Sequence, residues 1–110
     1  MLNRDQILQA QDLPHIDVEV PEWGGTVRVR AMTGHAREQY EEAYLGIAKS
    51  EANIRAAMCA YSLVDDNGEL LFTLDDIAAL GKKSAKALMR VFEAAQKLNA
   101  VGDSEAQEKN

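Results

Sequence analysis

The chain has 110 residues, 46% of them hydrophobic, and a formal net charge of −6. This size suits one domain with a modest core, and the acidic balance argues against general nucleic-acid binding. No stretch approaches the roughly 20 apolar residues of a membrane span, and the first residues, MLNRDQILQ, hold no apolar signal-peptide core. We therefore expect a cytoplasmic protein that neither binds nucleic acid nor crosses a membrane.

The first segment predicts a short helix and then a β-hairpin. Asn3 and Gln6 have capping-box spacing, so a helix is expected from there to about Asp12, before Pro14. The segments HIDVEV and TVRVRAM alternate with a period of two. The expected hairpin places acids of one strand beside arginines of the other. The alternating apolar side chains share the opposite face, namely Ile16, Val18, Val20, Val27, Val29 and Ala31.

The hairpin loop holds the one tryptophan of the chain. Pro21 ends the first strand, and Gly24 with Gly25 supplies the permissive backbone of a loop. Trp23 has two interpretations. It is either a lid over the end of the core or an exposed anchor for a partner.

Helices are expected through most of the remaining chain. Thr33 caps a helix over 34–49 with an acidic face, a break follows near Ser50, and Ser50 caps a second helix, EANIRAAMCAYSL. That helix is either core or an adaptable binding surface. Its Cys59 has apolar neighbours, which favours a small buried side chain.

The second half of the chain predicts a tight turn and two more helices. Asn67-Gly68 favours a type I′ turn in a second, very short hairpin. Thr73 with Asp76 begins a short helix that Gly81 ends as a C′ residue, and Ser84 caps the last helix, which Gly102 ends. We thus expect a mostly helical α+β fold of four to five helices, with residues 1–101 as a single domain and 102–110 as a disordered tail.

No catalytic, cofactor-binding or metal-binding residues are predicted. The segment DDNGE fails as a calcium loop, because Leu63 stands where the first acid is required. LGKKS lacks the first glycine of a phosphate-binding loop. His15 and His35 have no neighbour at metal-ligand spacing. We therefore expect a protein that is not an enzyme.

A basic stripe is the strongest candidate for a binding surface. Within 82–100 the cations outnumber the acids, and the cations predicted to share a face of the last helix are Lys83, Lys86, Arg90 and Lys97. The stripe is either an ordinary solvated face or an electrostatic match for an acidic surface. Such a surface could belong to the helix over 34–49, in the same chain or in a second copy.

The order of these segments resembles a known family. The hairpin VPEWGGTVRVRAMTG and the block DNGELLFTLDDIAALGKKSAKALMRVF are similar to tail assembly chaperones of long-tailed, siphovirus-type phages and prophages. The similarity spans roughly Pro14 to Val101. It implies a small, self-associating protein of the host cytoplasm that binds the tape measure protein, helps recruit tail tube protein, and is absent from the mature virion. The alternative is a virion component, a small head–tail connector or tail terminator.

The same resemblance implies a programmed −1 ribosomal frameshift near the end of the gene. The chain ends in Glu108-Lys109-Asn110, for which one possible coding sequence is GAA AAA AAC. This sequence contains a slippery heptamer in the correct frame. We therefore expect a longer minor product in which an added segment recruits the tube protein.

Overall fold

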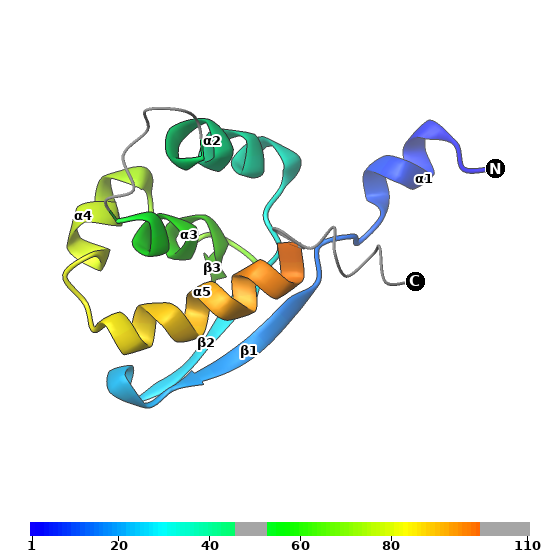
Figure 1. The fold of residues 1–110 in the computed structure, drawn as a ribbon. Helices are drawn as coiled ribbons and strands as arrows, with labels where there is room; N and C mark the ends of the chain where they lie inside the picture. Colours follow the sequence, from blue (N-terminus) through cyan, green and yellow to red (C-terminus); the bar gives the residue numbers. More distant parts are fainter. Residues whose placement is uncertain (46–52, 100–110) are drawn as a thin grey trace, which may run out of the picture.

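The computed structural model describes residues 1–45 and 53–99. Within these ranges it is an α+β fold of five α-helices, two 3₁₀ turns and a three-stranded antiparallel sheet (Figure 1). The elements are α1 (Arg4–Gln9), β1 (His15–Val20), η1 (Pro21–Trp23), β2 (Gly25–Arg30), α2 (Gly34–Tyr44), α3 (Ile54–Ser62), β3 (Leu63–Val64), η2 (Leu74–Asp76), α4 (Ile77–Leu80) and α5 (Ala85–Asn99). The predicted fold class is confirmed.

The hairpin has the register that its alternation predicts. Asp17 pairs with Arg28, and Val18 pairs with Val27. The Arg28 guanidinium donates two hydrogen bonds to the Asp17 carboxylate, at 2.8 and 3.2 Å. This bidentate contact holds the pKa of the Asp17 carboxyl below its ordinary value. In the sheet, β2 lies between β1 and β3.

Helix α3 is the centre of the core. Every residue from Ala56 to Ser62 is buried. Helix α5 packs between α3 and the hairpin, while α2 and α4 also pack on α3 (Figure 1). Cys59 is fully buried, as expected, and the interpretation of this helix as an exposed binding surface is wrong. Because aromatic residues are few, the small and aliphatic side chains of α3 and α5 fill most of this space.

Asn99 is a buried polar residue that closes the core at the end of α5. Its side-chain Oδ1 accepts a hydrogen bond from the Met32 backbone N–H at 2.6 Å, and its Nδ2 donates to the Ala95 carbonyl at 2.7 Å. The Arg37 guanidinium donates to the Asn99 carbonyl at 2.7 Å. The link between β2 and α2 is thereby joined to the last turn of α5.

Several helix boundaries differ from the sequence predictions. Helix α1 ends at Gln9, three residues before Asp12, because no residue in it is buried and no packing extends it. Helix α3 begins at Ile54 with Asn53 as its N-cap residue, so the predicted cap at Ser50 is wrong. The predicted break near Ser50, the Gly102 stop and the 102–110 tail lie outside the described residues.

Two predictions about glycine are also corrected. The turn before Gly68 is not type I′, because only Gly68 has a positive φ there, at 82°. Its N–H donates to the Asp65 carbonyl, which gives a type I turn followed by a left-handed glycine. Gly81 ends α4 in the right-handed conformation. An added Cβ there would meet the Asn53 side chain, so close approach explains the glycine.

Candidate binding surfaces

The tip of the hairpin is a compact turn that rests on the core. Pro21, Glu22 and Trp23 form one 3₁₀ turn, and Gly24 ends it with a left-handed φ of 75°, a conformation that glycine adopts without strain. Trp23 is half-buried and packs against the core cluster. The tip therefore presents one partly exposed aromatic ring at a fixed place on the surface.

An ion pair fastens this tip to α5. The Arg90 guanidinium donates two hydrogen bonds to the Glu22 carboxylate, at 2.9 and 3.1 Å. The hydrogen bonds from Arg90 are the largest influence on the Glu22 carboxyl, and they hold its pKa below the ordinary value. Arg90, predicted as a residue of a basic binding stripe, is thus engaged within the chain. No local pattern signals this contact, because Glu22 and Arg90 are far apart along the chain.

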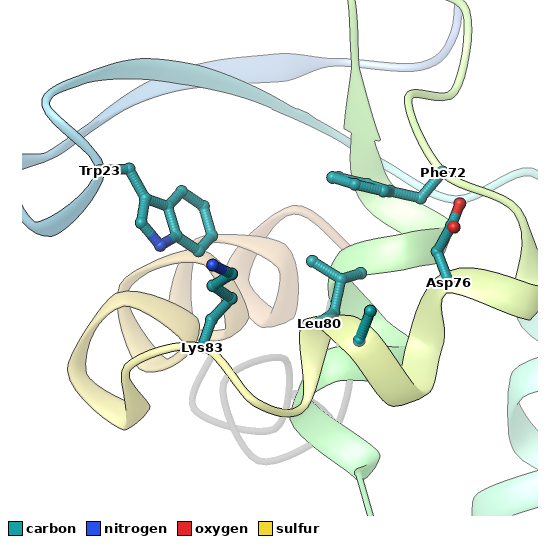
Figure 2. Close-up of a pocket in the computed structure, with 6 residues that line it drawn as sticks. Trp23, Phe72, Asp76, Leu80 and Lys83 are labelled. Carbon is teal, nitrogen blue, oxygen red and sulfur yellow. The ribbon is translucent and has the colours of Figure 1, made fainter.

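An apolar pocket opens beside Trp23 (Figure 2). It has a volume of about 360 Å³, and its lining comes from the hairpin tip, the segment after β3, and the η2–α4 region, namely Trp23, Phe72, Asp76, Ala79, Leu80 and Lys83. The Lys83 side chain extends toward the Trp23 ring (Figure 2). Two predicted partner-binding residues, Trp23 and Lys83, therefore line the same pocket. The Asp76 carboxylate lines it as well.

The other predicted basic residues lie along α5. Lys86 is exposed. Its positive charge lies close enough to Glu22 to help lower the pKa of that carboxyl. Lys97 is exposed in the last turn of α5. The predicted basic stripe thus divides into a group near the hairpin tip and a separate lysine at the other end of the helix. Whether these residues bind a partner stays a prediction.

A second surface, which we call the α2 groove, runs between α2 and the segment 69–74. Its largest part has a volume of about 640 Å³. The α2 side contributes His35 and Gln39, with Glu42 beside Leu74, and the other side includes the exposed leucines Leu70 and Leu74. Arg30 and Glu69 also line the groove. The sequence shows the acidic helix face and the apolar run ELLFTL separately. Only the tertiary fold brings Glu42 of that helix face beside Leu74 of that run.

The described residues offer little for chemistry. They contain no group of three or more His, Cys, Asp or Glu side chains placed to hold a metal ion. Burial raises the pKa of the Cys59 thiol to about 12, so the thiolate that a nucleophile requires is scarce near neutral pH. None of the helices within 1–45 and 53–99 is both long and apolar enough to cross a membrane.

Comparison with solved structures identifies a similar fold. The chain is similar to the tail assembly chaperone of bacteriophage HK97, with a TM-score of 0.62 and 22% sequence identity. The match covers 86% of this chain and 94% of that one. No family model and no curated protein matches the chain. The resemblance drawn from the hairpin and the block over 66–92 is thus confirmed at the level of the fold.

Proposed function

We propose that this chain is a tail assembly chaperone of a long-tailed phage. The observation that carries the proposal is the fold shared with the HK97 tail assembly chaperone over nearly the whole of both chains. The resemblance in the hairpin and in the block over 66–92 supports the same family. In this proposal the protein acts in the host cytoplasm, self-associates, holds the tape measure protein before tail assembly, and is left out of the mature virion.

The α2 groove is the surface that best suits a tape measure segment. Such a segment is expected to be helical with an apolar stripe, and helices of this kind dock their apolar face into grooves. The exposed Leu70 and Leu74 offer apolar contact. The carboxylate of Glu42, which shares a hollow with Leu74, favours a helix with flanking lysines or arginines. An adaptable apolar contact with a charged rim suits a long partner with many related segments.

Recruitment of tail tube protein is assigned to a longer form of the chain. In this proposal a −1 shift occurs at the codons of Glu108-Lys109-Asn110, which can form a slippery heptamer, and translation continues in the new frame. These residues lie outside the described structure. In this proposal the common domain holds the tape measure protein, and the added segment contacts the tube protein.

Co-expression tests the proposal directly. The native gene, with its downstream DNA and an N-terminal tag, is expressed with and without the tape measure gene of the same phage. We expect the tagged protein to keep the tape measure protein soluble and to purify with it. We also expect intact mass spectrometry to detect a minor, longer product that is joined after the 108–110 region.

Two results would contradict the proposal. One is a tape measure protein that stays insoluble and uncaptured while the tagged protein itself is folded by circular dichroism. The other is the presence of the chain in purified phage particles at fixed stoichiometry, which would assign it to a head–tail connector or tail terminator. A single product that ends at Asn110 would overturn only the frameshift.

A further inference from the structure

Arg30 is a half-buried cation in the lining of the α2 groove. Its Nε donates to the Ala31 carbonyl at 3.3 Å, and its Nη1 donates to the Gly68 carbonyl at 2.7 Å. Both partners are neutral. In the described part of the chain Arg30 forms no ion pair, whereas Arg28 and Arg90 each pair with a carboxylate. A guanidinium has five N–H donors, so Arg30 keeps donors for a partner group that is negative.

The two ends of the groove differ in charge. Arg30 lies at the end where α2 begins, near His35, and the dipole of a helix is positive at its start. At the other end the exposed Glu42 carboxylate lies beside Leu74, toward the negative end of the same dipole. Glu69 also lines the groove, but its side chain is exposed, so solvent screens its charge more than that of the half-buried Arg30.

A helix that lies along this groove takes its direction from the two ends. His35 and Ala43 are about 12 Å apart along α2, a length that about two turns of helix span. The last carbonyls of a helix are partly negative, so they suit Arg30 and the start of α2. The first N–H groups of a helix are partly positive, so they suit Glu42. Charged side chains in these two turns would strengthen the same match.

We propose that the helix held in the α2 groove lies antiparallel to α2. Its last turn carries an aspartate or glutamate that faces Arg30, its first turn carries a lysine or arginine that faces Glu42, and its apolar stripe contacts Leu70 and Leu74. This order of charges is the reverse of the one that stabilises an isolated helix, so it separates the segment from an ordinary amphipathic helix. The inference deepens the proposed function and rests on it, because it names the kind of tape measure segment that the groove takes.

Photochemical cross-linking to the unmodified chain measures the direction. The probe is a designed peptide of about 14 residues, held helical by a hydrocarbon bridge on its polar face. It has a leucine stripe, lysines in its first turn and glutamates in its last turn. A diazirine is placed at either end. Trypsin cleaves after Arg30 and Arg37, so the two ends of the groove fall in separate fragments, 31–37 and 38–49.

We expect the diazirine at the peptide's C-terminus to mark fragment 31–37, which holds His35. The diazirine at its N-terminus should mark fragment 38–49, which holds Glu42 and Ala43. The opposite assignment, or equal marking of both fragments from each end, would overturn the antiparallel direction. A folded chain that is marked in neither fragment would overturn the docking of such a helix in the groove.

Affinity measurements test the contact with Arg30. A second peptide has glutamines in place of the last-turn glutamates, and fluorescence anisotropy compares both peptides. The unmodified chain should bind the first about fivefold more tightly, and Arg30→Gln should bind the two alike, since the contact is lost from either side. Lys82→Gln, the same charge change at an exposed position outside the groove lining, should keep the preference.

Three controls complete the experiment. Circular dichroism checks that Arg30→Gln is folded, and the cross-linking result does not depend on that variant. A preference for the first peptide that persists in folded Arg30→Gln would overturn the role of Arg30. Capture of the tape measure protein is measured separately by co-expression. Capture together with the wrong cross-links would overturn only the direction, whereas loss of capture would overturn the proposed function.

Discussion

At the scale of single residues, Asn99 shows how one polar side chain joins α5 to the segment between β2 and α2. Its side chain accepts from the Met32 N–H and donates to Ala95. Asn99→Ala should lower the free energy of unfolding by about 1–3 kcal/mol, because the buried Met32 N–H loses its acceptor. Urea titration followed by circular dichroism measures the change. Gln96→Ala is the control, because Gln96 is half-buried on α5 and its side chain makes no hydrogen bond within the described residues. Equal losses in both variants would contradict the role of Asn99.

The sequence did not single out Asn99, and the reason is physical. Local patterns detect caps and alternating faces, since these depend on residues a few positions apart. The caps at Asn3, Thr33 and Ser84 were therefore predicted correctly. Asn99 is satisfied by a backbone group that is distant in sequence, and no local pattern encodes such a partner. The same limit hid the link between Glu22 and Arg90.

At the scale of elements, the Glu22–Arg90 pair ties the hairpin tip to α5. The pKa of Glu22 is depressed in the folded state, so its stabilisation is fully present above the ordinary glutamate value of 4.5 and is lost as pH falls through the lower folded value. Glu22→Gln should therefore lower Tm near pH 7, and the difference from the unmodified chain should shrink and vanish as the pH falls through the lowered pKa of Glu22. Calorimetry across this pH range measures it.

The matched control for this prediction is Glu38→Gln. Glu38 is exposed on α2 and makes no ion pair in the described part of the chain. We expect its variant to show no such pH-dependent difference in Tm. A Tm difference for Glu22→Gln that persists at low pH would mean that the substitution acts through packing of the tip and not through the ion pair.

Element types were easier to predict than turns and surfaces. The hairpin register followed from the alternation of Asp17–Val18 against Val27–Arg28, because a slip of one residue would expose the apolar face. The turn at Gly68 adopted another type, and the Asp65 carboxylate holds it by accepting hydrogen bonds from the Asn67 and Glu69 N–H groups. The α2 groove and the pocket beside Trp23 required the tertiary fold, since their walls come from segments that local patterns treat separately.

At the scale of the whole molecule, the α2 groove predicts how a tape measure helix is held. Glu42→Lys reverses the charge beside Leu74, so it should reduce capture of the tape measure protein most strongly at low salt. Leu74→Glu should reduce capture at every salt concentration, because it removes apolar contact. Leu71→Glu, exposed but outside this groove, is the matched control. Pull-down across a salt series measures all three. If Leu71→Glu weakens capture as much as Leu74→Glu, the tape measure helix binds a broader surface than the groove.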